Sequence, residues 1–102
     1  MAYQLVLQFP HDALADYDAM IALEEQIDEV LGELGEVDGH DAGEGEMNIF
    51  VFSPEPESAL AALASLLAPY MTSLRAAYRD DEADDERYIV LHPKGLTTFS
   101  VA

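Results

Sequence analysis

The chain has 102 residues, of which 21 are acidic and four are lysine or arginine, so its formal net charge is −17 at pH 7. A surface this negative repels phosphate backbones and anionic membranes, which argues against nucleic acids and membranes as partners. Half of the residues are apolar, which is typical of a folded domain and not of a disordered acidic tail. The chain has no cysteine, which excludes a disulfide framework and a thiolate zinc site.

The length predicts a single domain, residues 1–102, and the order of its elements, given below, makes it an α+β domain. The expected compartment is the cytoplasm. No apolar run approaches the roughly 20 residues of a membrane-spanning helix, and the first residues lack the basic and apolar regions of a signal peptide. The acidity has two interpretations. It is either a solvated surface that keeps the protein soluble or adapted to salt, or a surface that attracts a basic partner.

The first elements in chain order are a strand and a long helix. Residues 3–9 alternate, with Leu5, Leu7 and Phe9 on one face of a strand and polar glutamines on the other. An apolar stripe then predicts a helix that begins after Asp16 as N-cap and ends near residue 34, with Gly35 as the C′ residue.

A hairpin and a second helix follow. Residues 36–41 predict a short strand, residues 42–45 a glycine-rich turn, and residues 47–53 the strongest strand of the chain. Ser53-Pro54 marks a helix start, and the helix is expected over residues 56–68.

The C-terminal third alternates again over residues 74–79. Residues 80–86 hold six carboxylates in seven positions and predict a solvated loop. A strand over residues 87–92 and a short edge strand over residues 95–101 complete the chain.

This order of elements predicts the split βαβ, or ferredoxin-like, arrangement. Two helices cover one face of an antiparallel sheet, and the first and third strands lie at its centre. An α+β sheet with another strand order is the alternative.

The sheet face that the helices leave uncovered, the open face, is the candidate binding surface. Ile49 and Val51 suit the core, so their neighbours should point away from it. An apolar patch on such a face marks an interface. Two alternatives stay open: the C-terminal residues Leu96, Phe99 and Val101 cover this face, or the register is reversed and the phenylalanines lie in the core. The predicted binding residues are Gln4, Gln8, Asp38, His40, Asn48, Phe50, Phe52, Arg75 and Arg79.

Residues 38–46 are the most site-like stretch, because four carboxylates and an imidazole lie among glycines. The spacing does not match the EF-hand template, so the stretch predicts a solvated hairpin without metal, and no cofactor is expected. The chain shows no Ser–His elbow, cysteine nucleophile or HExxH motif. An enzyme could still use His40 with Asp38 or Asp41 as an acid–base pair.

Residues 37–52, with a Gly-x-Gly turn before an apolar strand that contains Asn48, resemble a hairpin of small bacterial ferredoxin-like proteins of unknown function. The resemblance implies a bacterial cytoplasmic origin and a strand-turn-strand, and it transfers no site.

These observations predict a non-enzymatic interaction protein that forms a homodimer through its open face. The first alternative is an immunity-like inhibitor that masks a basic, nucleic-acid-binding protein. The second is the small enzyme built on His40.

Overall fold

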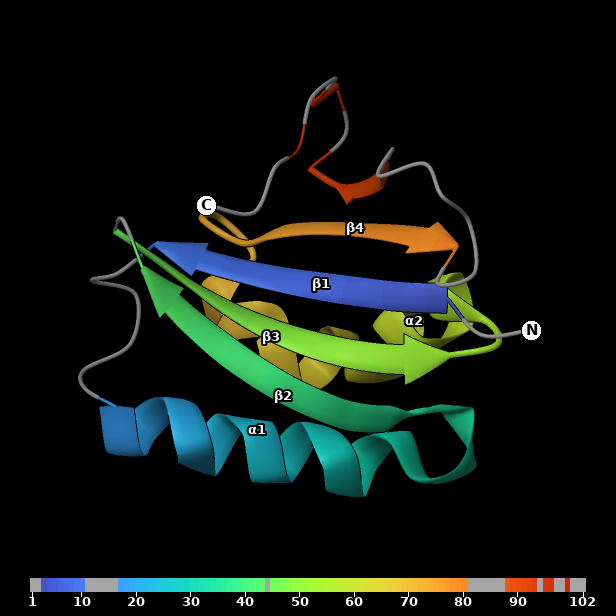
Figure 1. Ribbon diagram of the computed structural model, residues 1–102, viewed down its shortest axis with the longest axis horizontal. Helices are drawn as coiled ribbons and strands as arrows, with labels where there is room; N and C mark the ends of the chain where they lie inside the picture. Colours follow the sequence, from blue (N-terminus) through green and yellow to red (C-terminus); the bar gives the residue numbers. More distant parts are fainter. Residues whose placement is uncertain are drawn as a thin grey trace.

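The computed structural model describes residues 3–10, 17–43, 45–80, 88–93, 95–96 and 99. Within these ranges, five strands form one antiparallel sheet in the order β2-β3-β1-β4-β5 (Figure 1). The strands are β1 (Tyr3–Pro10), β2 (Glu36–Gly43), β3 (Glu46–Ser53), β4 (Arg75–Asp80) and β5 (Ile89–His92).

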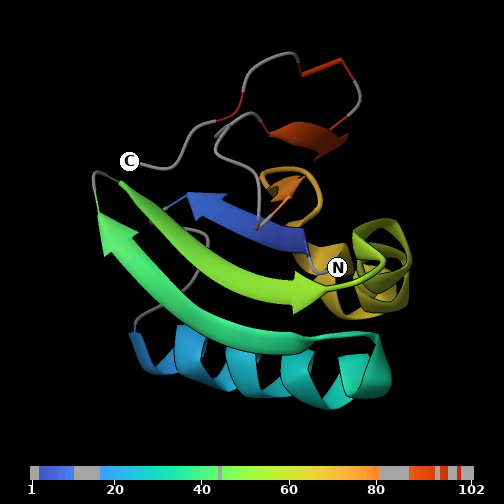
Figure 2. The ribbon, with the colours of Figure 1, turned by 45° about the vertical axis from the view of Figure 1, so that its right-hand side comes forward.

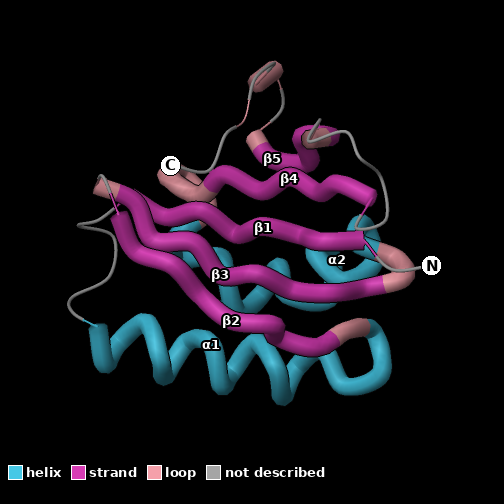
Figure 3. Tube along the Cα trace, in the orientation of Figure 1, coloured by secondary structure: helices cyan, strands magenta, loops and turns pink. Residues whose placement is uncertain are grey.

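Two helices, α1 (Tyr17–Leu31) and α2 (Pro56–Leu67), lie on the same side of the sheet, as Figure 2 shows. A short 3-10 turn follows each helix, η2 (Gly32–Leu34) after α1 and η3 (Ala68–Tyr70) after α2. Figure 3 shows β5 at the outer side of β4. The ferredoxin-like arrangement with an extra C-terminal strand is therefore confirmed, with β1 and β3 in the interior of the sheet.

The core lies between the sheet and the two helices. The odd-numbered residues of β1 and β3 point into it, as strand alternation predicts, and the apolar stripes of both helices meet them. Its most buried members are Leu5, Leu7, Phe9, Met20, Ile27, Leu31, Ile49, Val51, Ala59, Leu63, Leu67, Leu74 and Ala76, each at most 2% exposed.

The end of α1 differs from the prediction. The helix ends at Leu31, and Gly32 takes the left-handed conformation with φ of 53° that a C′ glycine typically adopts. Gly35 instead is extended, with φ of 170°. Its lack of a side chain lets β3 approach, because a Cβ there would lie 2.6 Å from the carbonyl oxygen of Phe52.

The start of α2 agrees with the helix predicted from residue 56. Pro56 is the first residue of α2, and the Ser53 hydroxyl lies just before it. The Ser53 Oγ donates to the carbonyl oxygen of Leu34 at 2.5 Å and accepts from the backbone N–H of Glu55 at 3.0 Å. The serine thus ties the end of η2 to the start of α2.

At the C-terminus, the described residues of the predicted edge strand, Gly95, Leu96 and Phe99, do not lie in a strand. Val101, the N-cap candidate Asp16 and residues 81–86 of the acidic loop lie outside the described residues. Of the helices in the described ranges, none combines the length and the apolarity needed to cross a membrane.

Candidate functional site

The strand register aligns the open-face residues in three rows that run across the sheet. Residues that lie directly opposite each other in neighbouring strands share a face. We name each row by two of its members. The Glu36–Arg79 row holds Glu36, Phe52, Gln4 and Arg79; the Phe50–Val6 row holds Gly39, Phe50, Val6, Ala77 and Val90; the Asp41–Arg75 row holds Asp41, Asn48, Gln8 and Arg75.

The Phe50–Val6 row is the apolar middle of the face. Val6 and Ala77 are fully buried but do not belong to the core cluster beneath the helices. Phe50 is partly exposed, as is Phe52 in the neighbouring row. The register thus places both phenylalanines on the open face, and Ile49 and Val51 in the core. Phe50 and Phe52 therefore give the open face an apolar surface that is only partly exposed to solvent.

Amide side chains occupy three of the four central positions of the polar rows, and Phe52 on β3 occupies the fourth. The Gln8 Nε2 donates to the Asn48 Oδ1 at 3.1 Å, and both residues are almost fully buried. In the other polar row, the Arg79 Nε donates to the Gln4 Oε1 at 3.2 Å. Both hydrogen bonds join side chains of neighbouring strands, so they fix the positions of these polar side chains on the face.

Charge divides the open face into an acidic and a basic side. Arg75 and Arg79 are the two Lys or Arg residues of the described ranges, and both lie on β4. Glu36 and Asp41 lie at the other end of the same rows, on the edge strand β2, and both are exposed. Within the described part of the chain, none of these four side chains forms an ion pair.

A bulge in β2 moves two predicted residues off this face. The register shifts between Val37 and Gly39, so the following residues point opposite to simple alternation. His40 therefore pairs with Ile49 and lies on the helix-covered side, and the prediction that placed it on the open face is wrong. Gly39, a glycine inside the predicted strand, was the sequence signal for this bulge. The same shift brings Asp41 onto the open face.

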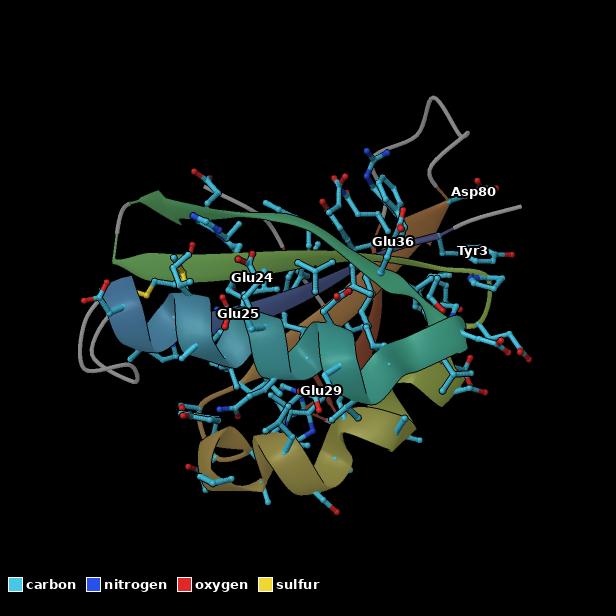
Figure 4. All side chains as sticks on the ribbon, turned by 90° about the horizontal axis from the view of Figure 1, so that it is seen from below. Tyr3, Glu24, Glu25, Glu29, Glu36 and Asp80 are labelled. Carbon is cyan, nitrogen blue, oxygen red and sulfur yellow. The ribbon has the colours of Figure 1, made fainter. Side chains whose placement is uncertain are left out.

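His40 bonds to α1. Its Nδ1 lies 3.0 Å from the Glu24 Oε2, and both side chains are partly buried. Figure 4 shows Glu24 between α1 and the sheet. Asp38, which lies in the bulge, lines a shallow hollow of about 290 Å³ together with α1 carboxylates, and not the open face.

The structure does not bring His40 and Asp41 together as the acid–base pair of the enzyme alternative. Asp41 and His40 are neighbours in one strand and point to opposite faces of the sheet. Among the described residues, no group of three or more His, Asp or Glu side chains is arranged to hold a metal ion.

A second hollow of about 310 Å³ opens where α2 begins, between Tyr3, Tyr78 and the first residues of the helix. The two tyrosine rings meet edge to face, with centroids 5.5 Å apart. Burial raises the pKa of the Tyr78 hydroxyl, and the Glu57 carboxylate and Tyr3 raise it further. The hollow lies on the helix-covered side and is separate from the open face.

Of the nine predicted site residues, seven share the open face: Gln4, Gln8, Asn48, Phe50, Phe52, Arg75 and Arg79. Sequence reasoning missed Glu36 and Asp41. The partner of Glu36 across the strands is Phe52, and this pairing depends on a register that one sequence does not display.

No protein-family model, curated protein or solved structure matches this chain.

Proposed function

We propose that this chain is a non-enzymatic interaction protein that pairs with a second copy of itself through the open face. The observation that carries the proposal is the charge division of that face. Two exposed carboxylates on β2 and the two arginines on β4 have no ion-pair partner within the described part of the chain. A second copy of the same face offers each of them an opposite charge.

The aromatic side chains supply the apolar part of this contact. Phe50 and Phe52 are partly exposed next to fully buried Val6. Partly exposed aromatics beside arginine are the composition that interfaces favour.

Pairing through the sheet edge is less favourable than pairing through the face. The edge strand β2 is bulged and carries Glu36, Asp38 and Asp41. Bulges and charges on an edge strand oppose the addition of another strand, and two such acidic edges would repel each other. The face is the better surface for self-association.

Phe50→Asp tests the proposal. The variant places a carboxylate in the contact, so we expect the dissociation constant of the dimer to rise at least about 100-fold, or about 2.7 kcal/mol. Each monomer should stay folded, because the core between sheet and helices is untouched. Sedimentation equilibrium gives the mass, and circular dichroism gives the fold.

Ile89→Asp is the matched control. Ile89 is 52% exposed and pairs with Tyr78, on the other side of the sheet. The same apolar-to-acid change there should leave the dimer intact. A Phe50→Asp variant that is folded and still dimeric contradicts the proposal. If Phe50→Asp unfolds the domain, Phe50→Ser replaces it in the same test. A folded Phe50→Ser variant that dimerises as tightly as the unmodified chain then contradicts the proposal.

A basic protein is the second candidate partner, in the sense of an immunity-like inhibitor that masks it. Exposed Glu25, Asp28 and Glu29 on α1 favour this candidate. Glu25 and Asp28 line a hollow with Asp38 and so add to the acidic edge of β2. Such a complex should weaken as salt rises. The test is binding of purified basic proteins at low and high salt, with Glu25→Gln and Glu29→Gln as variants that should lose affinity.

The proposal places the protein in a bacterial cytoplasm. The lack of cysteine supports a reducing compartment.

A further inference from the structure

We propose that the hollow at the start of α2 binds a small organic cation that carries a trimethylammonium group, between two tyrosine rings and two carboxylates. The inference goes beyond the proposed function, because this hollow lies on the helix-covered side of the sheet and needs no second copy of the chain. Its volume is about 310 Å³, and it is lined by Tyr3, Glu55, Pro56, Glu57, Ser58 and Tyr78.

The sheet places both tyrosine rings beside the first turn of α2. Tyr3 begins β1, and Tyr78 lies opposite Leu5 on the neighbouring strand β4, so both side chains point to the helix-covered side. Their rings are nearly perpendicular, at 86°, with centroids 5.5 Å apart. Both residues are only partly buried, and both line the hollow. The rings therefore form two walls of an aromatic corner that solvent reaches.

Two carboxylates border this corner. Glu55 is the N-cap residue of α2, but its side chain makes no capping hydrogen bond, and Glu57 follows in the first turn. Both residues are exposed, and neither forms an ion pair within the described ranges. Burial raises the pKa of the Tyr78 hydroxyl, and the Glu57 carboxylate raises it further. The negative field of Glu57 thus reaches the ring of Tyr78.

The rings, and not the acids alone, indicate the class of ligand. A carboxylate in the first turn of a helix stabilises that helix by itself, so Glu57 alone marks no site. The face of an aromatic ring attracts cations, and quaternary ammonium groups are the ligands that aromatic corners and cages recognise. A primary ammonium is strongly hydrated, so it loses more on leaving water.

The size and the charge of the hollow agree with a small cation. Ligand pockets usually measure roughly 300–1,000 Å³, and this hollow lies at the lower end of that range, which suits a compact group and not a nucleotide. The positive end of α2 opposes a cation with the equivalent of about half a charge. The two carboxylates outweigh it.

Choline tests the site on the unmodified chain, because it carries the trimethylammonium group. The neutral analogue 3,3-dimethylbutanol has the same shape without the charge, and ethanolamine has the charge without the methyl groups. We expect NMR titration of the tyrosine ring signals, at constant ionic strength, to give a dissociation constant of about 1 mM for choline. The constants of both analogues should be at least about fivefold higher. Equal binding of choline and either analogue would overturn the inference.

Two variants remove the parts of the site one at a time. Tyr3→Leu removes one ring and Glu57→Gln removes one charge, and each should raise the dissociation constant for choline at least about threefold. Tyr78→Phe keeps the ring, so its constant should stay within about twofold of the unmodified chain. Unchanged affinity in both Tyr3→Leu and Glu57→Gln would contradict the site.

Matched controls make the same changes elsewhere. Tyr70→Leu removes a ring that contacts Phe9 at the other end of α2, and Glu29→Gln removes an exposed charge from α1. Both should leave choline binding unchanged. If Glu29→Gln weakens it as much as Glu57→Gln does, choline follows the overall charge and the inference is wrong. If Tyr3→Leu unfolds the chain by circular dichroism, Glu57→Gln and the two analogues still decide.

The trimethylammonium group has two sources, a free small molecule or a trimethylated lysine of a protein. A short peptide with one trimethyllysine distinguishes them: tighter binding than choline assigns the group to a protein, and weaker binding assigns it to a small molecule. Either result supports the site. The outcome is also independent of the proposed function. A dimer that ignores choline overturns this inference alone, and a monomer that binds choline overturns the proposed function alone.

Discussion

Two glycines near the end of α1 have different physical requirements, although they are only three residues apart. Gly32 has a positive φ and open space around its Cα. Gly35 has an ordinary extended backbone but lies against the β3 backbone at Phe52. The first position needs a conformation that L-residues avoid, and the second needs the absence of a side chain.

We expect Gly35→Ala to lower the free energy of unfolding by at least about 2 kcal/mol, because the new Cβ would overlap a backbone oxygen that cannot rotate away. Gly32→Ala should cost about 1 kcal/mol, the usual penalty of a left-handed alanine. Urea unfolding of both variants checks the order. A larger loss for Gly32→Ala would contradict the proximity of Gly35 to β3.

Tyr78 gives the protein a dependence on alkaline pH. Its pKa is raised above the usual 10.0 by burial and by the Glu57 carboxylate, so the folded state holds this proton more firmly than the unfolded state does. The resulting stabilisation is fully present below pH 10 and is lost as the pH rises through the higher pKa of the folded state. Urea midpoints at about pH 8 and about pH 11 should therefore fall less for Tyr78→Phe than for the unmodified chain. An equal fall in both would contradict this role.

At the scale of elements, periodicity predicted what depends on local sequence. The alternation of β1 and β3 and the apolar stripe of α1 set which side chains enter the core, and these predictions agree with the buried positions. The bulge before Gly39 broke the alternation of β2, because one unpaired residue reverses every side chain after it. Only cross-strand register shows that Glu36 and Asp41 share rows with the arginines, and one sequence contains no record of that register.

The two faces of α1 should respond differently to truncation. Ile27 is fully buried between helix and sheet, while Val30 is 45% exposed on the same helix. Ile27→Ala should cost about 2–5 kcal/mol through lost burial and a cavity. Val30→Ala should stay within about 0.5 kcal/mol of the unmodified chain. Thermal or urea unfolding of the pair checks this assignment, and similar losses for both variants would contradict it.

At the scale of the whole molecule, two chains of net charge −17 repel each other at long range. Salt screens this repulsion, and it also screens the short-range attraction between the charged ends of the rows. Because these effects oppose each other, the dissociation constant of the dimer should change less than about threefold between roughly 0.05 and 0.5 M salt. A complex with a basic protein has no such compensation and should weaken strongly. Sedimentation at both salt concentrations distinguishes the homodimer from a complex with a basic protein. A homodimer that dissociates at high salt would contradict the expected cancellation of the two salt effects.

The central claim is that the open face joins two copies of the chain. The mass of the unmodified chain in solution, measured by sedimentation equilibrium up to about millimolar concentration, tests it most directly. We expect a mass of twice the 11.2 kDa of the single chain. A mass of 11.2 kDa at every concentration would contradict it.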